Sequence, residues 1–212
     1  ATSGSKEKAS AAERVKEASE PEGYFGPHVS LTVVAVGICC AVLAYYAKEI
    51  GDALPSGMNV YCQEKSKYGK SFDAFYPFYR SQHQDAATVK THVLASSIIT
   101  LIVSHDIRVG ISLGIGLASG LFMKELTRSI TKGFVEFGFM ILMYFWSMLH
   151  MKESLVKSAS ILIVAYGLAW YGHFVYEKNQ PANFIYPSYS LMADFRHFFG
   201  EVSKFYTESH KM

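Results

Sequence analysis

"SASILIVAYGLAWYGHFVY" occupies residues 158–176 and is long and apolar enough to cross a membrane as a helix. Spanning the hydrocarbon core of a bilayer takes about 20 apolar residues. Near its end this run carries His173, and Glu177 follows four residues later. Ionisable side chains at this depth are costly unless something compensates them, so the end of this segment is a candidate functional site.

The 212-residue chain as a whole is too apolar for an ordinary soluble domain. Of its residues 50% are hydrophobic, 15% are aromatic and 18% are charged. The net charge of +2 is nearly neutral and no basic stripe alternates with aromatic residues, so nucleic acid is not expected as a partner. Cys39 and Cys40 are adjacent in an apolar run and Cys62 stands apart, so no disulfide framework is indicated.

Four further apolar runs accompany the first. Residues 29–47 and 134–150 each have a length and composition that fit one membrane crossing. Two shorter runs, 92–104 and 109–123, flank the hydrophilic turn "HDIR" and fit either two short spans or a re-entrant hairpin. We therefore predict an all-α fold, a polytopic membrane helix bundle of about five segments.

The last part of the chain has a different pattern. Beyond Pro187, residues 188–206 place apolar side chains at helical spacing with polar ones between them. This pattern predicts a C-terminal amphipathic helix that lies on the membrane or on a neighbouring protein.

Small and aromatic residues in the runs suggest how the helices pack. Two GxxxG spacings in the run 109–123 should let helix backbones approach closely; they involve Gly110, Gly114, Gly116 and Gly120. Trp146 and Trp170 lie near run ends, where interfacial anchors are common.

The order of the segments brings four ionisable residues to one membrane face. His92 opens the second run, His173 and Glu177 close the fifth, and His83 lies on the loop just before that face. Imidazole together with carboxylate suits zinc, iron or manganese, and such a set with open positions suits non-haem Fe(II). The alternative is that Glu177 pairs with Lys178 or another cation while the histidines make ordinary hydrogen bonds.

The spacing of the histidines adds a constraint. His83 and His92 are nine residues apart and would point to opposite sides of a straight helix, so they can meet only across a bend or from two helices. The other five histidines need no special role; they are His28, His105, His150, His197 and His210. Of these, we expect His105 and His150 to lie toward the opposite membrane face.

Two stretches around these residues resemble a known family. "FYRSQHQDAATVKTH" (78–92) and "GHFVYEKNQPA" (172–182) are similar to the two motifs of the yeast-type 2-hydroxy fatty acid dioxygenase family. The resemblance implies an Fe(II)-dependent membrane enzyme of lipid α-oxidation, which uses O₂ to shorten a 2-hydroxy fatty acid by one carbon. By this resemblance the iron ligands are His83, His92 and His173, and Glu177 is a catalytic ligand or orienting residue.

The chain also departs from the family pattern. Members carry Asn-Pro-x-Asn after the first histidine, whereas this chain has Asp85, Ala86, Ala87 and Thr88. We divide the chain into four parts by composition and resemblance: a polar tail (1–28), an additional membrane span (29–47), a dioxygenase-like membrane domain (70–200) and a C-terminal tail (201–212).

The two added segments keep a second function open. The N-terminal tail is rich in Ala, Ser, Lys and Glu, a composition that is disordered in isolation and that fits the mature end left after a leader is removed. The chain could therefore be an accessory subunit of a large organellar complex with a vestigial or structural metal site. Either function predicts an integral organelle membrane, the mitochondrial inner membrane or the endoplasmic reticulum. The expected partners are membrane lipid or a 2-hydroxy fatty acid, and other subunits in the second case.

Overall fold

The computed structural model describes residues 29–53, 68–69, 71–127, 130 and 132–209. Every regular element in this part of the chain is a helix, which confirms the predicted all-α class. The N-terminal tail with His28, and also Cys62 and His210, lie outside the described residues.

Five apolar helices form the body of the protein. They are α2 (Leu31–Tyr45), α6 (Ala86–His105), α7 (Ile107–Leu126), α8 (Phe134–His150) and α9 (Leu155–Tyr171), the last continued by the π-helical turn η2 (Gly172–Glu177). Three segments are long and apolar enough to cross a membrane, namely α6, α7 and α9 with η2, while α2 and α8 are shorter. The chain is thus an integral membrane protein by length and composition. The two shorter runs, 92–104 and 109–123, belong to α6 and α7, which are 20 residues long each and extend beyond the runs.

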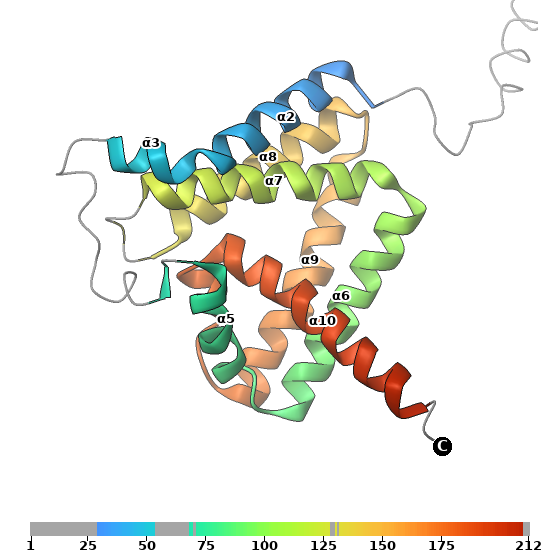
Figure 1. The fold of residues 1–212 in the computed structure, drawn as a ribbon. Helices are drawn as coiled ribbons and strands as arrows, with labels where there is room; N and C mark the ends of the chain where they lie inside the picture. Colours follow the sequence, from blue (N-terminus) through green and yellow to red (C-terminus); the bar gives the residue numbers. More distant parts are fainter. Residues whose placement is uncertain (1–28, 54–67, 70, 128–129, 131, 210–212) are drawn as a thin grey trace, which may run out of the picture.

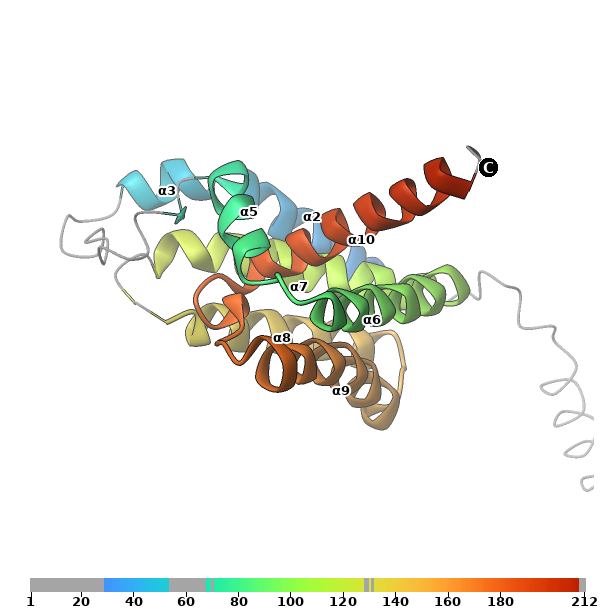
Figure 2. The ribbon, with the colours of Figure 1, turned by 90° about the horizontal axis from the view of Figure 1, so that it is seen from below.

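These helices pack as two pairs that cross each other. α7 lies against α8, with α2 along its other side, and α6 runs beside α9 (Figure 1). Three shorter elements complete the fold: α3 (Ala47–Ala53) extends α2, α5 (Phe72–Ser81) precedes α6, and the 3-10 turn η3 (Ala182–Phe184) leads into α10 (Pro187–Ser209). α10 contacts α8 at its start, crosses α6 and α7, and extends beyond the bundle at its C-terminal end (Figure 2).

The C-terminal helix forms as predicted, but the first half of it does not lie on the outside of the protein. Ser188, Ser190, Ala193 and His197 are buried, and only the last turns expose large apolar side chains. The fully buried carboxylate of Glu136 accepts hydrogen bonds from the backbone N and Oγ of Ser188, at 2.9 and 2.6 Å. A carboxylate is stabilised at a helix N-terminus, so this contact holds the start of α10 against α8.

The glycines of α7 differ in what they do. A Cβ on Gly116 would lie 3.0 Å from the carbonyl oxygen of Met140, and one on Gly120 would lie 2.5 Å from Ser188 Oγ. A Cβ on Gly114 would meet nothing within 4 Å. The GxxxG spacing from Gly116 to Gly120 is therefore the one that lets α7 and α8 approach closely.

We predict opposite effects for two glycine substitutions in α7. Gly120→Ala should lower the free energy of unfolding by about 1–3 kcal/mol, because the new methyl overpacks the contact with α8 and α10. Gly114→Ala should be neutral or raise it by up to about 1 kcal/mol, because alanine favours a helix and the space is free. Thermal unfolding of the two proteins in detergent measures the difference; equal stabilities would contradict the packing role of Gly120.

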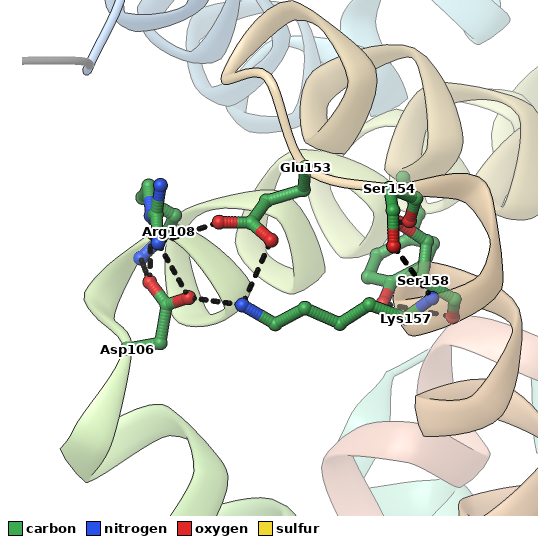
Figure 3. A network of polar contacts seen from close by, with 7 residues as sticks. Asp106, Arg108, Glu153, Ser154, Lys157 and Ser158 are labelled. Carbon is green, nitrogen blue, oxygen red and sulfur yellow. Dashed lines mark hydrogen bonds and ion pairs between the residues drawn. The ribbon is translucent and has the colours of Figure 1, made fainter. Parts of the chain in front are cut away.

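A network of charged side chains closes the end of the bundle where α6 meets α7 and α8 meets α9 (Figure 3). Asp106 accepts from Arg108 Nε at 2.9 Å and from Lys157 Nζ at 2.6 Å. Glu153 joins the same two cations, at 2.5 Å from Arg108 and 2.8 Å from Lys157. The charges of two carboxylates and two cations balance one another, which offsets the energetic cost of partly burying them.

His105 and His150 are at this end of the bundle, as predicted. His105 is the last residue of α6, directly before Asp106, and His150 is the last residue of α8, shortly before Glu153. His92 and His173 lie toward the far ends of α6 and α9. The ionisable residues are thus divided between two ends, with the charge network at one and the histidines of the expected site at the other.

The network also predicts how stability depends on pH. Burial by itself raises the pKa of Asp106, but the hydrogen bonds from Arg108 and Lys157 outweigh it and lower the pKa to about 2 from 3.8. A carboxyl whose pKa is lower in the folded state stabilises the protein above its unfolded pKa, and this contribution disappears as pH falls from 3.8 through about 2. Asp106→Asn should therefore lower the melting temperature at pH 7 and flatten its decline below pH 4.

A matched control is Asp73→Asn, because the ion pair between Asp73 and Arg196 is exposed on the surface. Exposed pairs contribute about 0–1 kcal/mol, so this control should unfold almost like the wild type. If both substitutions changed the acid profile equally, the network would not be the source of the effect.

Candidate metal centre

Three histidines from three elements meet inside the protein. His83 follows α5, His92 lies in the second turn of α6, and His173 is in η2. Each side chain is at most 5% exposed, and one ring nitrogen from each lies within 4.8 Å of the others. The structure thus brings together the three residues that the sequence analysis selected as metal ligands.

The chain bends between His83 and His92, as their spacing requires. The Asp85 carboxylate accepts from the backbone N of Ala87 at 2.7 Å and caps α6, and Gln84 Nε2 donates to the carbonyl oxygen of Arg80 at 2.6 Å. A side-chain acceptor at this position starts a helix without the help of a proline. The departure from the family's Asn-Pro-x-Asn pattern therefore leaves the turn intact.

A close helix contact brings His173 to the same place. Thr88 Oγ1 donates to the carbonyl oxygen of Gly172 at 3.1 Å, and a Cβ on Gly172 would lie 3.3 Å from the Cα of Thr88. Only a glycine lets η2 lie this close to α6. Short π-helical turns inside α-helices often occur at functional sites, and here the turn carries His173.

The orientation of His92 is set by Asp194 of α10. Nδ1 of His92 lies 2.8 Å from Asp194 Oδ1, and the hydroxyl of Tyr79 donates to the same oxygen at 2.5 Å. Burial alone raises the pKa of Asp194, but the nearby His92 and the hydrogen bonds from His92 and Tyr79 lower it overall. Asp194 is therefore ionised, accepts the Nδ1 proton of His92, and leaves Nε2 of that ring free to bind a metal.

The other two rings are held in the same way. Nδ1 of His83 lies 2.7 Å from the carbonyl oxygen of Tyr79, and Nδ1 of His173 lies 2.8 Å from Oδ1 of Asn179. Asn179 Nδ2 donates to the carbonyl oxygen of Gln82 at 3.1 Å, which fixes the amide so that its oxygen faces the histidine. All three rings therefore carry their proton on Nδ1 and present Nε2 as an electron-pair donor.

This arrangement fits a bound cation. Nε2 of His83 and Nε2 of His92 are 3.3 Å apart. With both protons on Nδ1, neither nitrogen can donate to the other, so their lone pairs repel unless a positive ion lies between them. Burial and the nearby His92 also lower the pKa of His83 to about 3, so this ring is the neutral form that binds metals.

The donor set narrows the choice of metal. Three imidazoles suit zinc, copper, iron or nickel, and hydrogen bonds from ligand Nδ1 atoms to a carboxylate or carbonyl are the usual support for such ligands. The described residues add no carboxylate to the group formed by His83, His92 and His173. A metal bound here would therefore keep open positions for other ligands.

Glu177 is at the edge of this centre. Its Oε1 accepts from the backbone N of Asp85 at 2.5 Å, and the side chain is half-buried. It thereby ties the end of η2 to the turn between His83 and His92. This contact suits the orienting role better than the ligand role, and we propose that Glu177 positions the two histidine-bearing segments.

Two residues near the centre were not selected from the sequence. In the sequence, Asp194 is one of the polar residues in the amphipathic pattern of 188–206, and His197 is one of the five histidines without a predicted special role. In the structure His197 is 3% exposed, and its ring centroid lies 6.4 Å from that of His83. The available signal was their spacing, because Ser190, Asp194 and His197 fall on one face of α10.

We predict that Asp194 controls metal affinity without being a ligand. Asp194→Asn should weaken metal binding by about 10–100-fold, because the amide no longer holds His92 as the carboxylate does. Co²⁺ or Fe²⁺ titration of the purified protein measures this, with Asp106→Asn at the other end of the bundle as the control. Unchanged affinity in Asp194→Asn would rule out the supporting role.

The sequence comparisons identify a family for the part of the chain that carries this site. A family model described as 2-hydroxy-palmitic acid dioxygenase Mpo1-like matches residues 69–206. The matched stretch includes the three histidines and Asp194 and covers more than half of the chain. Searches of curated proteins and of solved structures found no match. By this match, the chain belongs to the Mpo1-like family of 2-hydroxy-palmitic acid dioxygenases.

Proposed function

We propose that the protein is an Fe(II)-dependent membrane dioxygenase that shortens 2-hydroxy fatty acids by one carbon. The observation that carries this proposal is the set of three buried imidazoles, each held at Nδ1 so that Nε2 faces the same point. The family name supplies the substrate class and the use of O₂.

The reaction disfavours zinc among the metals that three imidazoles could hold, and the resemblance to the dioxygenase family favours iron among the others. Zinc has no redox chemistry, whereas oxidation of a 2-hydroxy acid by O₂ requires electron transfer. Bound Fe(II) would supply that redox chemistry and a place for O₂ and the hydroxy acid. The balance is one O₂ per substrate: the C1–C2 bond breaks, C1 leaves as CO₂, C2 becomes the new carboxyl carbon, and water forms.

The protein's own residues contribute binding, orientation and exclusion of water. His83, His92 and His173 would hold the metal, with Asp194 and Asn179 fixing two of the rings. An apolar cavity of about 60 Å³ begins at His92 and extends between α6, α9 and α10, and it suits part of an alkyl chain. Such a site would receive its lipid substrate from the organelle membrane, with the mitochondrial inner membrane and the endoplasmic reticulum as the two candidates.

The second candidate function is an accessory subunit of a membrane complex. It would require only that these residues join the two histidine-bearing segments. The bonds from Glu177 to Asp85 and from Asn179 to Gln82 would be enough to join the two segments. A subunit with a vestigial site gives no reason to hold three Nε2 atoms toward one another at the end of an apolar cavity, so the intact support of the histidines favours a bound metal. A subunit with a structural metal would keep the same support, and turnover separates it from the enzyme.

The test is turnover by the purified protein loaded with Fe(II). We expect O₂-dependent conversion of 2-hydroxypalmitate to the acid one carbon shorter, measured by mass spectrometry. His92→Ala should lose both iron and turnover while the protein still folds, because helix packing depends on the apolar runs. His150→Ala is the matched control, because it removes a histidine at the other end of the bundle, and it should retain iron and most of the turnover.

Two outcomes would count against the proposal. Wild-type protein that binds iron but converts no 2-hydroxy acid would favour the subunit. Iron that stays bound in His92→Ala would refute the ligand assignment.

A further inference from the structure

Two buried hydrogen-bond donors beside the histidines have no partner among the described residues. They are Nε1 of Trp170 and Oγ of Ser190. Both residues line a small cavity of about 20 Å³ together with His83, His92 and His173. Leaving a buried donor without a partner is costly, so donors in this state deserve an explanation.

The same elements that build the metal centre also place these donors. Ser190 precedes Asp194 by four residues on α10, and Trp170 precedes His173 by three residues at the end of α9. Residues three or four apart lie on the same face of a helix, so each donor is on the face that carries a residue of the centre. Ser190 is only 4% exposed, which excludes bulk water as its regular partner.

Trp170 was expected to be an interfacial anchor, and its surroundings differ from that expectation. Its ring packs between Tyr166 and Phe184, with centroid distances of 5.9 and 5.4 Å, and Nε1 is buried. An indole at the membrane interface normally turns this N–H toward water or lipid headgroups. Here the donor is inside the protein.

The shape of the adjoining space indicates what these donors bind. The larger, apolar cavity of about 60 Å³ shares His92, Tyr166 and Asp194 with the small one and continues to Ile99 and Ile161. Ile99 is seven residues beyond His92 on α6, a rise of about 10 Å along the helix. A ligand that fills both spaces has a polar end with hydrogen-bond acceptors and an apolar chain.

The charge of the lining selects among such ligands. In the described part of the chain neither cavity is lined by a lysine or arginine, and the one carboxylate in the lining is that of Asp194, whose Oδ1 already accepts from Tyr79 and lies 2.8 Å from Nδ1 of His92. A bound metal would therefore be the positive charge that an anionic ligand meets here. A phosphate head, with up to two negative charges, would lack cationic side-chain partners here. A carboxylate carries one charge and accepts several hydrogen bonds, which two donors beside a metal can satisfy.

We propose that the indole N–H of Trp170 and the hydroxyl of Ser190 bind the carboxylate of a fatty acid whose chain enters the apolar cavity. This inference rests on the proposed function and extends it, because it assigns the residues that position the substrate. Trp170 and Ser190 act here as positioning residues, and the metal ligands remain the three histidines.

The experiment compares Trp170→Phe and Ser190→Ala with the wild type, all loaded with metal in nanodiscs. Each change removes one donor and nearly preserves shape. We expect the dissociation constant for radiolabelled palmitate to rise about tenfold in each variant, because bonds to a charged acceptor are the strong ones. The affinity for hexadecanol, which has the same chain and no carboxylate, should change less than about threefold, and metal content should stay at the wild-type level.

Trp146→Phe is the matched control, because Trp146 packs against His150 at the other end of the bundle. It should bind palmitate like the wild type. Wild-type affinity for palmitate in both donor variants, or an equal loss for palmitate and hexadecanol, would overturn the inference.

Palmitate binding does not depend on turnover, so the inference and the proposed function can fail separately. Weaker palmitate binding in the variants of a protein that converts no 2-hydroxy acid would retain the carboxylate site and reject the enzyme. Normal conversion with an unchanged KM for 2-hydroxypalmitate in both variants would retain the enzyme and reject the carboxylate site.

Discussion

The 3.3 Å separation between Nε2 of His83 and Nε2 of His92 is the constraint on which the rest of the structure depends. Two lone pairs at this distance repel each other. The rings keep this arrangement only because each ring is fixed through Nδ1 and because a cation can lie between the two Nε2 atoms. The backbone of α5, the carboxylate of Asp194 and the amide of Asn179 supply the three acceptors. A buried histidine cluster without these acceptors would turn its rings away.

The C-terminal helix links this centre to the membrane bundle. Glu136 of α8 caps the start of α10 through Ser188, and two turns later Asp194 reaches His92 on α6. A buried carboxylate is stable only when it accepts hydrogen bonds, and each of these two accepts at least two. The same helix carries Ser190 and His197 on its buried face. One helix thus supports the metal centre and supplies one of the two donors that we propose bind the substrate.

The buried polar groups at the two ends of the bundle differ in how completely they are paired. At one end two carboxylates and two cations neutralise one another, and each carboxylate is paired with both cations. These residues are Asp106, Glu153, Arg108 and Lys157. At the other end, acceptors are matched to the Nδ1 atoms, and Nε2 of His83 faces Nε2 of His92. Two further donors there, of Trp170 and Ser190, have no partner among the described residues. A complete network stabilises a fold, whereas an incomplete one beside a cavity is a place for ligands.

The sequence alone was enough to predict the apolar helices and to predict that the three histidines lie at one end of them. Runs of apolar residues must become helices in a membrane, because only a helix satisfies its own backbone there, and the alternation of crossings puts His92 and His173 at the same end. The nine-residue spacing of His83 and His92 also required the bend that Asp85 makes. Only the tertiary structure decided the rest. Asp194 meets His92 across 102 residues, and the inward turn of Trp170 depends on packing against Phe184. Helical spacing gives the face of a residue but not what lies opposite, so the partners of a side chain follow only from how the helices cross.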